Sequence, residues 1–315
     1  MMTAGVMRYS RSAMLDSLSR DFIKTARAKG LPEWRINFIH GFRVALTPVI
    51  VLIGLIVFLI ILLASIFAPL LTSHDPMKIN LRAMLQPPSW EHIFGTDKTG
   101  RDVFARILYG GRVSILVGLG SALIGAFIGV GVGCYAGYKG GWIDVIALRV
   151  SEIFMAFPQI ILVLLLVSIV GQSLGNLMLI FVLTGWGAMY RLTRARVLSL
   201  REEEYVQALQ SFGLSTWLIC YKHILPNALG PIAVNITLTT AMFILAEAGL
   251  SFLGLGVPPS IPTWGNILIV AQDLRVLQNN WWLWLPVGAV ISLFVMAVNF
   301  IGDGLRDSAD PTLQG

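Results

Sequence analysis

The sequence has little of what redox, disulfide-stabilised or metal-centred proteins need. Only 13% of its 315 residues are charged, and it has two cysteines and four histidines. Cys134 lies in an apolar segment and Cys220 in a polar loop, so no extracellular disulfide framework is predicted. The histidines are scattered over loops without the spacing of metal ligands, so no metal site is predicted.

Signatures of catalysis are also missing. The nearest glycine–lysine stretch, GCYAGYKGG at residues 133–141, lacks the Walker A spacing, and no nucleophile–base pair is recognisable. We therefore predict a protein that is not an enzyme and has no cofactor. If its activity depends on ATP, another chain must hydrolyse the ATP. The net charge of +6 is spread among loops, which gives little support to nucleic-acid binding.

Apolar residues dominate instead. The chain is 56% hydrophobic with a mean hydropathy of +0.76, which is too apolar for a soluble domain of this size. Several runs approach or exceed the roughly 18–20 apolar residues that cross a bilayer. The sequence thus predicts an all-α polytopic membrane protein with six transmembrane helices, at residues 46–70, 113–136, 145–170, 177–190, 228–250 and 281–301. A polar outer segment is expected at residues 71–111, and a partly re-entrant outer loop at 251–280.

Charged residues inside these spans need partners, because an unpaired charge in a bilayer is costly. Glu152 follows Arg149 by three residues, which predicts an ion pair within one helix. Glu247 has no evident partner in its own helix. It is either a protonated, hydrogen-bonded packing residue or part of a translocation path, and the sequence favours neither.

Small residues recur every four positions in the second predicted span. Such a stripe lets a neighbouring helix approach closely. We therefore assign a helix-packing role, and no ligand, to Gly125, Gly129, Gly133 and Gly137.

A polar loop at residues 201–227 separates two apolar segments. Its first part predicts a short amphipathic helix with Tyr205, Leu209 and Phe212 on its apolar face. Gly213 fits a helix stop, and Pro226 fits the start of the next apolar helix. Such a loop either caps the helices or binds another protein, and composition alone favours the cap.

The residue pattern of this loop resembles the EAA loop of ABC-importer permeases, although Gln207 and Leu209 stand where that family has Glu and Ala. The resemblance implies a coupling helix that docks into a cytoplasmic ATPase. The residues that it assigns to this coupling are Glu204, Gln207, Ala208, Gly213, Ile224, Leu225 and Pro226.

Four longer motifs, covering residues 46–315 in order, resemble the second-subunit branch of the dipeptide/oligopeptide/nickel ABC-permease family. They are GTDKTGRDVFARILYGGRVSILVG, LTRARVLSLREEEYV, EAGLSFLGLGVPPSIPTWG and NFIGDGLRDSADP. The resemblance implies the type I ABC-importer architecture and a heterodimer with a homologous first permease subunit. It also implies two cytoplasmic ABC ATPase subunits, an extracytoplasmic solute-binding protein, and peptides or nickel complexes as cargo.

Two other functional classes remain as alternatives: a proton-coupled secondary transporter that uses Glu247, and a membrane scaffold without transport. The absence of inverted repeats and the coupling-loop pattern weigh against the proton-coupled class.

Residues 1–45 form a basic arm that precedes the first span. The arm aligns without a gap on the coupling loop, with identities at Gly30 and Gly213, Trp34 and Trp217, and Pro48 and Pro231. It resembles the coupling loop of the partner permease. It is either a remnant of gene fusion or of a misplaced start, or a real cytoplasmic arm whose basic residues favour the lipid surface. We expect both termini on the cytoplasmic side of a bacterial or archaeal cytoplasmic membrane, although the distribution of basic residues supports this only weakly once the arm is left out.

Overall fold

The structure is a computed structural model that describes residue 32 and residues 42–309. Most of the basic arm, and with it the resemblance to a coupling loop, lies outside these residues. Within them the backbone is helical, and extended segments pair only at an isolated bridge between Thr96 and Asp102. The prediction of an all-α fold is therefore confirmed for the described part of the chain.

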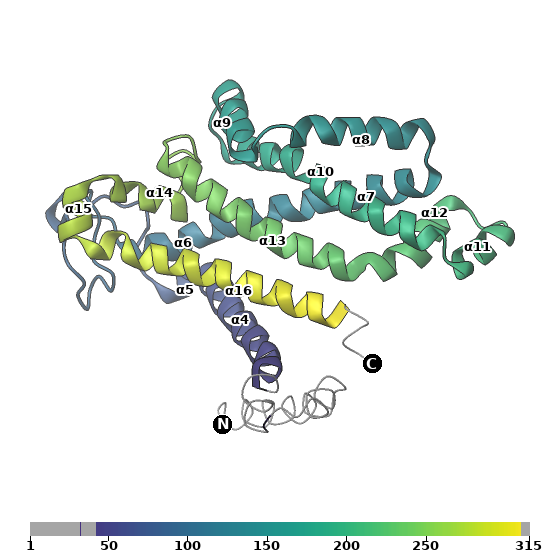
Figure 1. The fold of residues 1–315 in the computed structure, drawn as a ribbon. Helices are drawn as coiled ribbons and strands as arrows, with labels where there is room; N and C mark the ends of the chain where they lie inside the picture. Colours follow the sequence, from purple (N-terminus) through teal and green to yellow (C-terminus); the bar gives the residue numbers. More distant parts are fainter. Residues whose placement is uncertain (1–31, 33–41, 310–315) are drawn as a thin grey trace.

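Most of the long helices run along the length of the molecule and short elements gather at each end, whereas the helix at Phe42–Ile66 projects from the others at a steep angle (Figure 1). The α-helices are α4 (Phe42–Ile66), α5 (Ala68–Leu71), α6 (Val103–Ile115), α7 (Ser121–Lys139), α8 (Gly141–Met155), α9 (Gln159–Val170), α10 (Leu174–Arg201), α11 (Glu204–Ser211), α12 (Thr216–Leu218), α13 (Leu225–Phe252), α14 (Trp264–Leu268), α15 (Leu274–Asn279) and α16 (Leu285–Ala309). The π-turns η3 (Leu116–Gly120) and η4 (Ile219–Ile224) join α6 to α7 and α12 to α13. The remaining turns are the 3₁₀ segments η2 (Leu81–Ala83), η5 (Ile269–Gln272) and η6 (Trp281–Leu283).

The second predicted span is longer than the sequence suggested. A continuous helix covers Val103–Lys139, whereas the span was placed at 113–136 and the outer segment was extended to residue 111. The helix begins early because Asp102 caps it: its carboxylate accepts a hydrogen bond from the backbone N–H of Ala105 at 2.6 Å. Residues 103–111, the last part of the predicted outer segment, are therefore helical.

Four helices of the described residues are long and apolar enough to cross a membrane: Pro48–Ile66, Val103–Lys139, Thr216–Phe252 and Trp281–Asp307. A fifth is reached if the bent pair Gly141–Met155 and Gln159–Val170 counts as one span. The predicted span at 177–190 lies inside α10, whose 28 residues are long enough to cross a membrane. Its glycine, asparagine and arginine residues make it less apolar than the other four helices. The multi-pass character is thus confirmed, while the count of six remains a prediction.

The third predicted span, residues 145–170, is wrong as a continuous helix. Helix α8 ends at Met155, α9 begins at Gln159, and their axes differ by 88°. The break falls at Pro158, which has no N–H to donate to the preceding turn and disfavours helical backbone in the residue before it.

Among the described residues, helices α7 and α10 share the most extensive contact, and α16 packs against both α4 and α13. The four glycines predicted to pack helices are all buried in α7. A Cβ atom built on Gly129 would lie 2.7 Å from the carbonyl oxygen of Trp186, and one on Gly133 would lie 2.8 Å from that of Tyr190. The backbones of the two helices therefore meet directly along this stripe.

Candidate functional site

The loop at residues 201–227 forms one end of the molecule, where α11 and α12 lie (Figure 1). Helix α11 ends where Gly213 takes a φ of +77°, and the backbone N–H of Leu214 returns to the carbonyl of Leu209 at 3.3 Å. This left-handed glycine with its backward hydrogen bond is a common way to end a helix. The expected helix stop at Gly213 is therefore confirmed.

The base of this loop is firmly held on α7. The Tyr221 hydroxyl donates a hydrogen bond to the carbonyl of Gly131 at 2.9 Å. Next to it, the buried thiols of Cys134 and Cys220 each donate to the backbone carbonyl of the other, at 3.4 Å and 3.6 Å. Val206 packs into the same buried cluster. A movement of the loop would therefore be transmitted to α7.

The three apolar residues predicted to share one face of helix α11 differ in burial. Val206 is fully buried and Leu209 packs against the same cluster, whereas Phe212 is 80% exposed and Tyr205 is also exposed. The buried stripe follows the three-residue spacing from Val206 to Leu209, because that side of the helix faces the base of the loop. An apolar surface is left on the outside.

The residues assigned to ATPase coupling lie at different depths. Five of them are exposed: Glu204, Gln207, Ala208, Gly213 and Pro226. Ile224 is fully buried and Leu225 is half-buried, so these two support the loop from inside. Trp217 and Leu218 are exposed on the same loop, and the family pattern did not point to either of them.

Pro226 lies in the first turn of α13, which begins at Leu225, so the expected start of the next apolar helix at Pro226 is confirmed. Helix α12 and the π-turn η4 precede it without a break, and the helical backbone is therefore continuous from Thr216, where Ser215 caps it, to Phe252. Pro226 follows the π-turn η4 inside this helix. Proline cannot donate to the carbonyl four residues earlier, and a wider turn at this point relieves that mismatch.

Glu247 is fully buried in a cluster of hydroxyl groups. Its Oε1 atom accepts hydrogen bonds from Ser251 at 2.9 Å and from Thr263 at 2.8 Å, and Oε2 lies 3.4 Å from the hydroxyl of Ser114. Ser114 in turn accepts from the backbone N–H of Trp264 at 3.0 Å. The carboxyl group thus joins α6, α13 and the loop before α14. The partner in its own helix, Ser251, was missed by the sequence analysis.

One ion pair lies within α8, and another joins α8 to α10. Arg149 and Glu152 form the predicted pair within α8 at 2.8 Å, and it is exposed. A second pair was not predicted: the Arg194 guanidinium donates two hydrogen bonds, of 2.5 and 2.6 Å, to Asp144, which also accepts from the Tyr190 hydroxyl. No sequence signal links residues that lie fifty positions apart.

The lobe formed by residues 72–102, which we call the outer lobe, is built around the buried side chain of Asp97. Asp97 pairs with Arg101 at 2.8 Å and with the buried Arg106 at 2.6 Å, and Thr99 also donates to it. Burial by itself would raise the pKa of Asp97. The hydrogen bonds from Thr99 and Arg101 and the charges of Arg106 and Arg101 outweigh burial, so the pKa of Asp97 lies below its ordinary value.

The outer lobe also brings two of the scattered histidines together. His92 Nδ1 lies 2.9 Å from Asp102 Oδ2, and the rings of His74 and His92 have centroids 4.9 Å apart. The prediction that the histidines lack metal-ligand spacing holds for their positions in the sequence, but not for these two in space. Seventeen residues separate them in the chain, so sequence reasoning cannot show that they are close.

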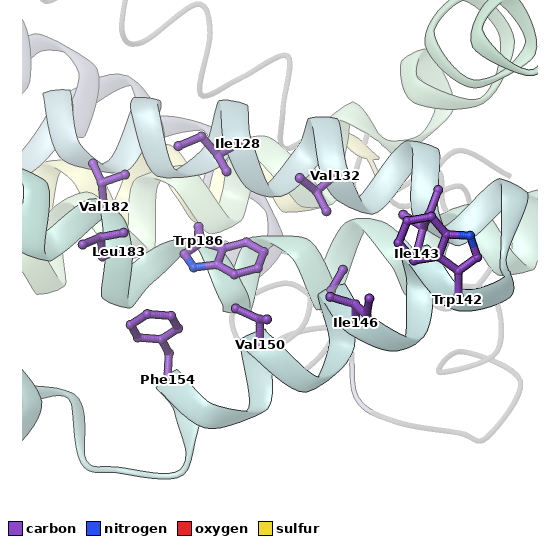
Figure 2. A pocket seen from close by; sticks show the side chains of 11 residues that line it. Ile128, Val132, Trp142, Ile143, Ile146, Val150, Phe154, Val182, Leu183 and Trp186 are labelled. Atoms are coloured by element: carbon purple, nitrogen blue, oxygen red, sulfur yellow. The ribbon is translucent and has the colours of Figure 1, made fainter.

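An apolar groove of about 610 Å³ lies between α7, α8 and α10. In Figure 2 the side chains of Trp186 and Phe154 approach it from opposite walls, and Trp142 lies at one end. No charged side chain lines the groove, whose lining is apolar apart from the indole N–H groups of Trp142 and Trp186.

Comparison with known proteins decides the class. The family model for the "binding-protein-dependent transport system inner membrane component" matches residues 1–128 and 129–315. The chain belongs to this family. It is therefore a multi-pass inner-membrane permease component of a transport system, and the family is not a catalytic one.

Curated relatives carry related names. A putative peptide permease protein of Brucella suis is 43% identical over 258 residues, which cover 82% of this permease and 85% of the relative. The dipeptide transport system permease protein DppC of Bacillus subtilis is 41% identical over 263 residues, with 83% and 81% covered. The oligopeptide transport system permease protein OppC of the same species is 40% identical over 264 residues, with 84% and 86% covered. The resemblance to the second-subunit branch is thus confirmed.

A solved structure supports the fold. The permease is similar to a chain of the MetNI methionine ABC transporter in an inward-facing conformation, with a TM-score of 0.50 and 21% identity. The match covers 64% of this permease and 94% of that chain. An ABC-importer permease fold is therefore shown, in agreement with the prediction.

Proposed function

We propose that this permease forms half of the translocation path of an ATP-driven importer of di- or oligopeptides, with nickel complexes as the second candidate cargo. The names of the relatives at 40–43% identity support peptides as the cargo class. The observation that carries the coupling part of this proposal is the exposed apolar surface of the loop at 201–227.

We infer that this loop docks into a separate ATPase subunit. Tyr205, Phe212 and Trp217 are exposed aromatic side chains on a loop whose base is fixed to α7. Exposed aromatic side chains on a rigid support are the usual anchors of protein interfaces. Polar members of the loop such as Glu204 and Gln207 would then form the rim of the contact.

The full assembly proposed here contains a homologous first permease subunit, two cytoplasmic ABC ATPases and an extracytoplasmic solute-binding protein. We propose residues 46–315 as the transmembrane domain and residues 1–45 as a cytoplasmic basic arm. The membrane is the cytoplasmic membrane of a bacterium or archaeon, with both termini and the coupling loop on the cytoplasmic side. The outer lobe then faces the solute-binding protein.

Glu247 is assigned a positioning role in this proposal. Its carboxyl group is fully buried within this chain alone, so it can line a translocation path only if the loop before α14 moves away. We infer that it latches this loop onto α13 and α6.

A matched pair of substitutions at Gly213 tests the docking surface. A side chain at Gly213 meets no atom within 4 Å, but any L-residue there is strained by the φ of +77°. Gly213→Ala adds this strain, roughly 1–2 kcal/mol, with almost no bulk. Gly213→Trp adds the same strain and a large side chain on the docking surface.

The expected result, in proteoliposomes that hold both permeases, the ATPases and the binding protein, is that Gly213→Trp abolishes substrate-stimulated ATP hydrolysis while Gly213→Ala retains most of it. Phe212→Ala should weaken ATPase binding by tenfold or more, as truncation of an aromatic anchor does. Normal stimulation in Gly213→Trp would place the ATPase contact elsewhere on the chain.

The energy source separates the functional classes. Uptake of a labelled peptide that needs ATP supports the importer. Uptake driven by a proton gradient without ATP would favour the proton-coupled transporter, and no uptake under either condition would favour a scaffold.

A further inference from the structure

Three side chains that can bind a metal converge in the outer lobe. His74, His92 and Asp102 each offer one ligand atom, and these atoms lie within 4.8 Å of one another. They come from three separate segments: the chain just after α5, the loop at residues 89–95, and the N-cap of α6. Only the fold brings them together.

The backbone of each of these residues is fixed. The N–H of His74 donates to Thr72 Oγ1 at 3.2 Å, and the N–H of His92 donates to Ser89 Oγ at 3.0 Å. Asp102 uses Oδ1 to cap α6, which leaves Oδ2 directed at His92. The cluster is therefore held in position by the surrounding loops, as binding sites require.

Solvent reaches the cluster through a cavity of about 500 Å³. His74 is half-buried at its edge, while His92 and Asp102 are buried deeper. Asp75 and Glu91 also line the cavity, so carboxylates outnumber the one lysine among its lining residues. This excess of negative charge favours the entry of a cation.

We propose that His74, His92 and Asp102 bind one divalent transition-metal ion, with a higher affinity for Zn²⁺ than for Ni²⁺. Two imidazole nitrogens and one carboxylate oxygen are a ligand set suited to these ions, and a fourth position stays open for water. Mg²⁺ and Ca²⁺ prefer sites made only of oxygen ligands and are not expected to compete. The bound ion joins the segment after α5 to the start of α6, and so fixes the outer lobe on the membrane helix.

This site is a property of this chain alone and does not depend on the cargo or the partners. The test therefore uses the full chain, purified in detergent without a histidine tag. Isothermal titration with ZnCl₂ should show one ion bound per chain, weaker binding of NiCl₂, and no heat of binding with MgCl₂.

The variant that isolates the site is His74→Ala, because His74 is half-buried and has no capping role. It should weaken Zn²⁺ binding by at least tenfold, since even loss of a residue that only supports a ligand costs roughly 10–100-fold in affinity. His223→Ala is the matched control, because His223 lies in η4 at the base of the coupling loop, and it should bind Zn²⁺ as the unaltered chain does. Unchanged circular dichroism spectra would show that both variants fold.

X-ray absorption at the zinc edge gives a second measurement. Two imidazole ligands are expected in the unaltered chain and one in His74→Ala. The proposal is overturned if the unaltered chain binds no Zn²⁺, if His74→Ala binds it equally well, or if His223→Ala weakens binding to the same extent.

Discussion

The contact of α7 with α10 can be tested by adding a single methyl group to it. Gly133 faces α10, and a Cβ atom there would lie 2.8 Å from the carbonyl oxygen of Tyr190 and 2.9 Å from the Cβ of Thr193. Gly131, two residues earlier on the same helix, has only the Tyr221 hydroxyl nearby, at 3.9 Å. Gly133→Ala and Gly131→Ala are therefore the same chemical change on opposite sides of one helix.

Two effects determine the outcome. Replacing glycine by alanine inside a helix stabilises it by about 0.5–1 kcal/mol, because alanine loses less conformational freedom on folding. Forcing a methyl group into a packed contact costs about 1–3 kcal/mol. The main obstacle at Gly133 is backbone and Cβ of α10, which cannot rotate away as the end of a side chain can. We therefore expect Gly133→Ala to be about 1–3 kcal/mol less stable than Gly131→Ala.

The measurement is the free energy of unfolding of the purified chain, from titration with a denaturing detergent followed by circular dichroism. The other glycines of the stripe extend the series. Gly129→Ala should resemble Gly133→Ala, Gly137→Ala should be intermediate with a nearest contact of 3.3 Å, and Gly125→Ala, with 3.8 Å, should be tolerated. Equal stability of Gly133→Ala and Gly131→Ala would show that the two backbones do not approach as closely as described.

Three further predictions concern buried polar groups. Glu247→Gln should be nearly as stable as the unaltered chain, because the amide oxygen can accept the same hydroxyl donors, whereas Glu247→Leu should lose roughly 1–3 kcal/mol per donor left without a partner, as measured by thermal unfolding. Asp97 has a lowered pKa in the folded chain, so its stabilising effect should persist at neutral pH and be lost as the pH falls below 3.8, whereas Asp97→Asn should remove that acid transition from the unfolding curve. Asp144→Asn should loosen α8 from α10 and raise the amide hydrogen exchange of α8; unchanged exchange would mean that the Arg194 pair contributes nothing to holding α8.

Local sequence signals predicted those parts of the fold that depend on local physics. Hydropathy located most of the long helices, and Gly213 ended a helix as its conformational freedom suggested. The four-residue glycine spacing identified the packed face of α7, although it gave all four glycines equal weight. Only the structure shows that a Cβ atom on Gly129 or Gly133 would lie within 3.0 Å of the α10 backbone, whereas one on Gly125 or Gly137 would not, because this depends on the exact path of α10.

The remaining features arise from contacts between segments that are distant in the chain. Two partners of Glu247, Ser114 and Thr263, come from α6 and from the loop before α14, and the Asp144–Arg194 pair joins two helices. Neither pairing has a periodicity that a sequence can display. The break at Pro158 could have been predicted, because proline inside an apolar run is a standard sign of a kink.

The continuous helix from Thr216 to Phe252 has the geometry of a lever. It begins in the exposed loop and ends five residues beyond the buried Glu247, so one helix connects the loop to the Glu247 cluster (Figure 1). Its 37 residues span about 55 Å, and a tilt of about 10° around one end would move the other by roughly 10 Å. A small push on the loop would therefore be amplified at the far end, and the wide turn before Pro226 is where such a lever would yield first.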